Sequence, residues 1–236
     1  MSKLKRLAAP AYWPIEAKTK KYVIKPKPGP HTLETSMPLG VVIRDVMKHA
    51  ETLREVKTIL NKGLVKIDGR TRKDHGFPVG FMDVIELGDD AYRVLAGKNG
   101  LYMKPVQKGE LFKLARVEDK RHLGKGKIQL SLHDGTNIIA AKDEYKTGDV
   151  LVMETGKQVK EVLRFEKGAA ALIMSGRNMG ALVRIKKIII TKSSHPNIVV
   201  VTLNGQDVPV PKGYVFVVGK EAPAISLDGG QDEQEQ

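Results

Sequence analysis

The spacing of apolar residues between positions 38 and 50 predicts an amphipathic helix. Pro38 suits the first helical position, because a proline there gives up no helical hydrogen bond. The apolar side chains that follow recur every three or four residues: Leu39, Val42, Ile43, Val46, Met47 and Ala50. A stripe of this kind covers one side of a helix and favours packing against a core.

A second helix and a hairpin are predicted directly after the first helix. Thr52 and Glu55 have the spacing of a capping box, which predicts a helix that begins after Thr52. Gly63 is the expected left-handed stop. A turn signal, Asp-Gly at 68–69, then separates two strand-like runs. These runs are 64–67 and 81–87.

The chain from residue 92 onward is predicted to be rich in strands. Short β-prone runs alternate with turn signals there, which favours barrels or strongly bent sheets over a parallel α/β fold. The unbroken apolar run Ile188–Ile190 predicts a buried strand. The predicted strands are 111–117, 128–132, 150–153, 159–165, 182–190, 198–203 and 214–218. The expected fold class is α+β, with strands in most of the chain.

The N-terminal 36 residues are predicted to form an extended basic arm. The first thirty contain five prolines and little apolar periodicity. Trp13, the only tryptophan, has two interpretations: packing on the body of the protein, which is preferred, or stacking on an RNA base. Arms of this kind become ordered on RNA, so deleting residues 1–27 is expected to leave the melting temperature nearly unchanged.

The charge of the chain points to a polyanionic partner. Forty Lys and Arg against twenty-seven Asp and Glu give a net charge of +13. The excess collects in residues 1–30 and 167–220, each with a net charge of +7, whereas 221–236 hold five acids and no base. A solvated surface mixes its signs, so two basic blocks favour two contact zones for nucleic-acid phosphates. The alternative is a merely soluble basic protein.

A third group of basic residues surrounds the second predicted helix. Seven of them lie within twenty residues, at a helix N-terminus and a turn, where backbone N–H groups also point outward. A solvated charged face is the alternative interpretation. The predicted RNA-binding residues of the whole chain are Lys3, Lys5, Arg6, Trp13, Lys20, Lys21, Arg44, Lys48, Arg54, Lys57, Lys62, Lys66, Arg70, Arg72, Lys73, Arg177, Asn178, Arg184, Lys186, Lys187 and Lys192.

The sequence gives no support for catalysis, a metal site or a cofactor. There is no cysteine, no histidine pair with ligand spacing and no phosphate-binding loop. Gly124-Lys-Gly126 predicts a flexible turn, because no helix pattern follows it. His133 and Asp134 are neighbours on a predicted strand end and would face opposite sides. A lone aspartate, Asp83 or Asp143 for instance, is the remaining candidate for an enzyme.

No membrane span or secretory signal is expected either. The chain has no run near eighteen apolar residues and no apolar N-terminal stretch. The absence of cysteine fits a cytoplasmic setting.

Four runs of residues resemble parts of known families. Residues 53–70, LREVKTILNKGLVKIDGR, resemble the RNA-binding motif named after bacterial small-subunit ribosomal protein four. The flanks LKRLAAP (4–10) and FPVGFMDVI (77–85) resemble the S4e family of archaeal and eukaryotic ribosomal proteins, and the lack of a basic C-terminal extension suggests the archaeal type. Residues 172–180, LIMSGRNMG, resemble a KOW motif, with Val183 where that motif usually has a glycine.

The resemblance implies a structural constituent of the small ribosomal subunit that binds rRNA through several basic surfaces. The expected partners are small-subunit rRNA and neighbouring ribosomal proteins, with no small-molecule substrate. A KOW-containing transcription or translation accessory factor that binds RNA is the alternative, and an RNA-modifying enzyme is less favoured. The predicted domains are a basic N-terminal arm 1–36, an S4-type RNA-binding domain 37–88, a β-rich central domain 89–166, a KOW-type SH3-like β-barrel 167–220 and an acidic tail 221–236.

Overall fold

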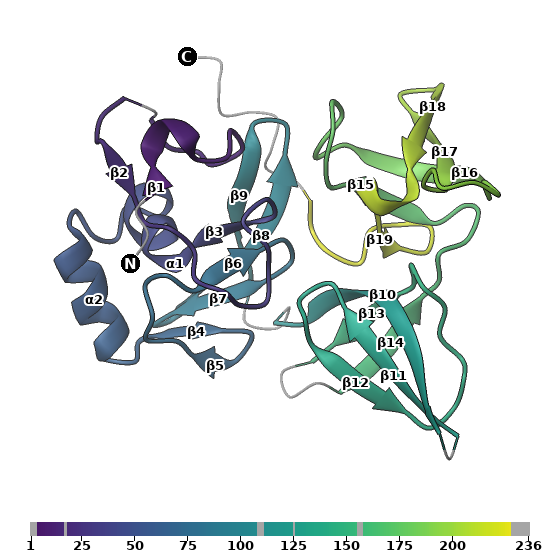
Figure 1. Ribbon diagram of the computed structural model, residues 1–236, viewed down its shortest axis with the longest axis horizontal. Coiled ribbons are helices and arrows are strands. Elements are labelled where there is room, and N and C mark those ends of the chain that lie inside the picture. Colours follow the sequence, from purple (N-terminus) through teal and green to yellow (C-terminus); the bar gives the residue numbers. More distant parts are fainter. Residues whose placement is uncertain (1–3, 17, 108–110, 125, 155–157, 228–236) are drawn as a thin grey trace. The chain divides into compact units, whose positions relative to one another are not determined.

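The computed structural model describes residues 4–16, 18–107, 111–124, 126–154 and 158–227. The described residues form two compact units (Figure 1). The first unit comprises those up to Leu95, with Asn99–Lys113 and Asp134–Thr136. The second comprises Ala96–Lys98, Leu114–His133 and the described residues from Asn137 onward. Strands predominate and helices are few, which confirms the expected composition of the fold.

The first predicted helix is shorter than its apolar stripe suggests. It consists of α1 (Leu39–Val41) followed by a π-helical turn, η2 (Val42–Val46). The backbone N–H of Met47 donates to the carbonyl of Val42, five residues back, at 2.8 Å. Lys48 then has φ +56°, in the left-handed region that a continuing helix cannot use. The prediction of a helix as far as residue 50 is therefore wrong.

The second predicted helix is confirmed. α2 (Leu53–Asn61) begins after Thr52, whose side chain accepts from the Glu55 backbone N–H, while the Glu55 side chain accepts from the Thr52 backbone. Gly63 follows the helix with φ +75°. Val56 and Leu60 are fully buried, so one side of α2 faces the core and the other faces solvent.

A five-stranded antiparallel sheet completes the core of the first unit. Its order is β5-β4-β7-β8-β9. A smaller two-stranded sheet pairs β3, which directly precedes α1, with β6, which precedes β7. The boundary predicted at residue 88 falls inside the larger sheet, because β7 and β8 pair across a tight turn at Gly88. The strands are β3 (Ser36–Pro38), β4 (Val65–Ile67), β5 (Arg70–Thr71), β6 (Pro78–Gly80), β7 (Val84–Leu87), β8 (Asp90–Gly97) and β9 (Gly100–Pro105).

The described N-terminal residues are a folded part of the first unit, which corrects the prediction of an extended arm. β1 (Leu4–Lys5) pairs with β2 (Tyr22–Val23), and a short 3-10 helix, η1 (Arg6–Ala8), follows β1. The indole of Trp13 is 3% exposed and its N–H donates to the Ser36 carbonyl at 2.9 Å. Burial of a large ring with its one donor satisfied holds the segment to the core.

The second unit contains two five-stranded antiparallel sheets. Their orders are β12-β11-β10-β13-β14 and β18-β17-β16-β15-β19. Each of the seven strands predicted after residue 92 overlaps an observed one, and β13 and β17 agree with the predicted bounds. The strands are β10 (Lys113–Gly124), β11 (Lys127–Leu132), β12 (Asn137–Ala140), β13 (Val150–Met153), β14 (Val159–Leu163), β15 (Ala170–Ile173), β16 (Leu182–Ile189), β17 (Ile198–Leu203), β18 (Gln206–Pro211) and β19 (Val215–Gly219), with a 3-10 turn, η4 (Lys212–Tyr214).

The run Ile188–Ile190 is not the buried strand that was predicted. Ile189 is 40% exposed and Ile190 is 76% exposed. A β-bulge lies between Ile185 and Lys187 in the pairing of β16 with β17. An extra residue in one strand shifts the alternation of faces, so the inward pattern of Val183 and Ile185 does not continue through the isoleucines.

Candidate nucleic-acid interface

The first unit carries an exposed group of six basic side chains around α2 and the β4–β5 hairpin. Because Val56 and Leu60 face the core, the basic residues of α2 lie on its solvent side. Strand β4 alternates in the same way, with Val65 and Ile67 buried and the lysine between them exposed. We call this group the first basic cluster: Arg54, Lys57, Lys62, Lys66, Arg70 and Lys73.

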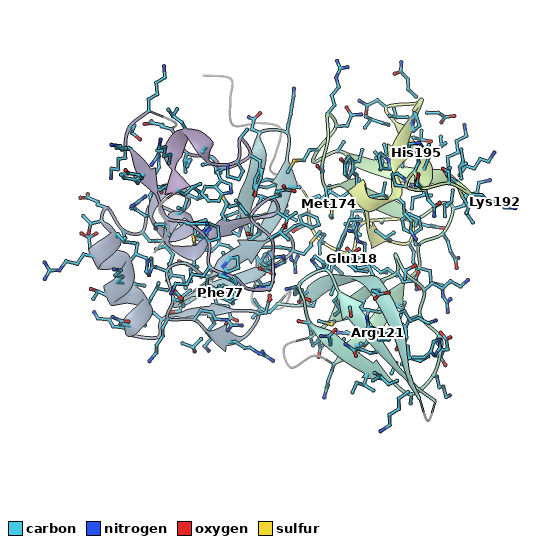
Figure 2. All side chains as sticks on the ribbon, in the orientation of Figure 1. Phe77, Glu118, Arg121, Met174, Lys192 and His195 are labelled. Carbon is cyan, nitrogen blue, oxygen red and sulfur yellow. The ribbon has the colours of Figure 1, made fainter. Side chains whose placement is uncertain are left out.

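Arg72 and Arg44 were predicted to contact RNA, but each already has a partner in the protein. The Arg72 guanidinium carbon lies 4.4 Å from the centre of the Phe77 ring, and the residue is half-buried (Figure 2 labels Phe77). Arg44 forms two hydrogen bonds to the Asp45 carboxylate, at 3.1 and 2.7 Å. Arg72 and Arg44 are therefore less available to phosphate than the side chains of the first basic cluster. Lys48, another predicted RNA-binding residue, is exposed.

The N-terminal candidates divide between surface and interior. Lys5, Lys20 and Lys21 are exposed. Arg6 is 6% exposed and its Nε donates to the Glu16 carbonyl, so the structure uses it within the fold, as it does Trp13. The prediction that Arg6 is open to RNA is corrected, because its guanidinium is buried against a backbone acceptor. Of the two interpretations of Trp13, the structure agrees with the preferred one, packing on the protein, and not with stacking on an RNA base. Lys3 lies outside the described residues.

The second unit presents basic residues on β16 and on two loops. Exposed and buried residues alternate at the start of β16: Val183 and Ile185 are buried, and Arg184 and Lys186 are exposed. Arg184 and Lys186 therefore share one exposed face, as predicted. Lys186 forms an ion pair with Asp207. The other basic candidates of this unit are also exposed, and Asn178 is half-buried. We call the following the second basic surface: Arg177, Arg184, Lys187 and Lys192 (Figure 2 labels Lys192).

The loop that carries Arg177 and Asn178 depends on glycine. Gly176 and Gly180 have φ of +91° and +86°. A Cβ on Gly180 would stand 2.6 Å from the Cα of Gly97, so only glycine fits there. Val183, which stands where the KOW pattern has a glycine, is a buried residue of β16.

A buried charged network in the first unit was missed by sequence reasoning. The ammonium of Lys113 lies 2.7 Å from the Asp68 carboxylate, 2.6 Å from that of Asp83 and 3.0 Å from that of Asp134. The imidazole of His31 lies 3.0 Å from the other oxygen of Asp83. We call these five groups the charged network. Their side chains are 2–7% exposed except for Asp68, at 31%.

Burial and mutual attraction shift the pKa of these groups in opposite directions. Burial raises the pKa of Asp68 to about 6, with the Asp83 charge adding to the rise and Lys113 opposing it. Burial also disfavours the charged form of Asp83, but His31 and Lys113 hold its pKa well below its usual range. The carboxylates outweigh burial at Lys113 and at His31, and raise the pKa of each above its ordinary value. With Asp68 and His31 both protonated, the network carries no net charge.

Comparison with known proteins gives both family models and full-length relatives. Residues 88–159 match the model of ribosomal family S4e, residues 2–34 match the RS4NT (NUC023) domain and residues 37–85 match the S4 domain. The chain is 43% identical to the small ribosomal subunit protein eS4 of Methanothermobacter thermautotrophicus, over 97% of this chain and 96% of the relative. The eS4 of Methanocaldococcus jannaschii is 40% identical, over 95% and 96%.

The chain belongs to the S4e family of ribosomal proteins.

The fold of this S4e chain agrees with a solved relative. The crystal structure of the 30S ribosomal protein S4e from Thermoplasma acidophilum superposes with a TM-score of 0.70 at 32% identity. The superposition covers 79% of this chain and 96% of that one. The first basic cluster falls inside the S4 match at residues 37–85.

The S4e geometry accounts for the two aspartates that sequence reasoning left as enzyme candidates. Asp83 is 1% exposed and is engaged by Lys113, His31 and the Gly80 backbone N–H. Asp143 is an exposed residue paired with Lys120. Each carboxylate therefore has a cationic partner within the protein.

The remaining chemical candidates are also structural groups. His133 Nδ1 accepts a hydrogen bond from the Arg116 backbone at 3.2 Å, and its ring meets Phe216 edge-on. Asp134 is turned to Lys113 instead. Among the described residues no three His, Asp or Glu side chains gather as a metal site. No described helix is long and apolar enough to cross a membrane.

The run at 77–85 contributes two residues to the charged network and its surroundings in this S4e chain. Gly80 and Asp83 both lie in it, and a Cβ on Gly80 would stand 2.4 Å from the His31 ring. The glycine therefore admits the imidazole and the aspartate binds it. The glycine and the aspartate were visible in the sequence, but the partners of Asp83 lie 30 and 52 residues away.

Proposed function

We propose that this S4e protein is a structural constituent of the small ribosomal subunit that binds rRNA through separate basic surfaces. The observation that carries the proposal is the first basic cluster, which is exposed and lies within the S4 match. The relatives are named small ribosomal subunit proteins. The partners are small-subunit rRNA and the ribosomal proteins beside it, and the location is the ribosome of the cytoplasm. All relatives cited are archaeal, which supports the archaeal type.

In the proposed mechanism, basic side chains held by folded elements of the protein neutralise the phosphates of rRNA. Lys and Arg side chains displace counterions from phosphates, which supplies affinity with little sequence specificity. Six cations on α2 and the adjoining hairpin are held by rigid elements, so they meet phosphates at fixed spacings. Recognition of RNA by shape and backbone is the common mode for folded RNA.

The second basic surface is proposed as a further rRNA contact on a KOW-type barrel, residues 167–220. Its support is the antiparallel sheet β18-β17-β16-β15-β19 together with the glycine-dependent loop that presents Arg177. The accessory-factor alternative is not favoured, since family models and relatives of nearly the same length are ribosomal. The family is one of ribosomal proteins and not of enzymes.

The test is binding to small subunits and to their rRNA. The protein should co-sediment with small subunits at low salt and leave them at high salt. Replacing Arg54, Lys57 and Arg70 with Gln should leave the fold intact, because all three are exposed. The slope of log affinity against log salt should become shallower by roughly 0.7 to 0.9 for each phosphate that the variant no longer binds.

A matched control removes three exposed lysines of the second unit, Lys142, Lys146 and Lys160. The control should keep nearly the whole slope. An unchanged slope in the folded variant of the first basic cluster would show that this surface does not contact rRNA.

A further inference from the structure

The outer part of β10 is exposed, in contrast to the strand's first residues. The first five residues of β10, Lys113–Val117, are buried, whereas the residues from Glu118 to Gly124 are exposed except for a half-buried Lys120. The pairing with β11 nevertheless continues to Gly124, opposite Lys127. Figure 1 shows β10 and β11 running side by side. The outer part of β10 is therefore exposed, while β11 beside it is anchored by the buried side chains of Ile128 and Leu130 and by pairing with β12.

The residues at the end of the hairpin are exposed on both strands. Arg121 and His122 are neighbours on one strand, so they point to opposite faces, and both are exposed (Figure 2 labels Arg121). At Gly124 and Gly126 nothing in the described part of the chain lies within 4 Å of where a Cβ would stand. The exposed side chains at this end of the hairpin are thus open to a partner.

We call the end of the hairpin, positions 121–127 of the sequence, the tip, and its charged residues are all basic. From position 120 to 133 the sequence contains four basic residues and no acid. Lys120 is held by Asp143 and by the Tyr145 carbonyl. No ion pair joins Arg121 or Lys127 to an acid among the described residues. The tip therefore presents unneutralised positive charge.

We propose that the tip of the β10–β11 hairpin is a separate contact site for the phosphate backbone of small-subunit rRNA, made by Arg121 and Lys127. The inference rests on the proposed function and adds a third surface to it. The core of a protein–protein interface is depleted of charged residues, whereas the described part of the tip has one exposed large apolar side chain, Leu123, beside Arg121 and Lys127. The two glycines, with φ of +83° and +73°, carry no side chain that would keep a phosphate from the backbone N–H groups.

The first arm of the test is the salt dependence of binding. The double variant Arg121→Gln/Lys127→Gln is compared with Lys142→Gln/Lys160→Gln, which removes two exposed lysines of the same unit that lie beside acids. Lys142 precedes Asp143, and Lys160 is paired with Glu154. The slope of log affinity against log salt should become shallower by roughly 1.4 to 1.8 in the tip variant, because two phosphates are no longer bound. The control should change little.

The second arm places a cleavage reagent on the tip. The chain has no cysteine, so His122→Cys supplies a single site for a tethered iron chelate in reconstituted subunits. Hydroxyl radicals from this site should cut the rRNA at a few adjoining nucleotides, and those from Lys160→Cys should not cut there. Cleavage of a neighbouring protein with no rRNA cuts would overturn the proposal, because the tip would then face protein.

The outcomes separate the inference from the proposed function. Wild-type binding with a normal salt slope, together with an unchanged slope in the tip variant, would refute the tip alone. Failure of the wild-type protein to bind small-subunit rRNA would refute the function itself.

Discussion

Replacing Lys113 with Met should destabilise the first unit more than a change at an exposed surface lysine. The ammonium contacts three carboxylates, at 2.6 to 3.0 Å, and its side chain is 7% exposed. Removing one partner from a buried ionic group costs about 3–5 kcal/mol, because the remaining charges stay desolvated. Over a unit of this size, a loss of that magnitude lowers the melting temperature by about 10 °C or more.

The assay is thermal and urea unfolding followed by circular dichroism at pH 7.5. The control is Lys160→Met, which breaks an exposed pair with Glu154, and such pairs contribute about 0–1 kcal/mol. Without the ammonium, the carboxylates repel one another, which raises their pKa. The loss in Lys113→Met should therefore shrink as the pH falls from 7.5 to 5, because protonation relieves the repulsion.

A double variant, Lys113→Met with Asp83→Asn, tests whether the loss comes from the unpaired charge. The double variant should be less destabilised than the sum of the two single variants, because neutralising Asp83 removes part of the repulsion. A Lys113→Met protein within about 1 kcal/mol of wild type at pH 7.5 would refute the reasoning. So would a large loss that does not change with pH.

Three further predictions concern pH, the N-terminal segment and the helix cap. The pKa of Asp68, about 6 in the fold against 3.8 ordinarily, means that the folded state holds its proton more tightly, so its contribution to stability falls as pH rises from about 4 to 6. The raised pKa of His31 gives stability that is present below about pH 6.5 and is lost as pH rises through the folded value. The melting temperature of the wild-type protein should decline over both pH windows. Asp68→Asn should remove the decline between about pH 4 and 6, and His31→Gln should remove the decline above about pH 6.5. A wild-type melting temperature that does not change over these pH ranges would contradict both pKa shifts. Trp13→Ala should cost about 3–5 kcal/mol in urea unfolding, against the near-zero effect expected of an extended arm, with Leu7→Ala, an exposed residue, as control. Thr52→Ala should cost about 1 kcal/mol, rescued by Thr52→Ser, and equal losses in the two variants would exclude the cap as the cause.

Local patterns in the sequence were sufficient for the elements whose stabilising contacts lie within a few residues. The capping box of Thr52 and Glu55 and the stop at Gly63 set the bounds of α2, since each depends on groups three or four positions apart. Strict alternation in β16 was sufficient to place Arg184 and Lys186 on one exposed face, because side chains in a strand alternate by simple geometry. The exposed positions of Arg54 and Lys57 on α2 followed in the same way from helix periodicity.

Contacts between distant segments decided the rest. Proline content and charge predicted an extended arm, but the ring of Trp13 is buried because its backbone acceptor at Ser36 is brought beside it only in the folded unit. The charged network joins residues 21 to 52 positions apart, and no periodicity relates positions so far apart. The free energy of burying a ring or a carboxylate depends on what surrounds it in space. The sequence by itself therefore determined α2, the strands after residue 92 and the exposed basic residues of α2 and β16, and only the tertiary structure decided which polar groups are buried and which stay exposed.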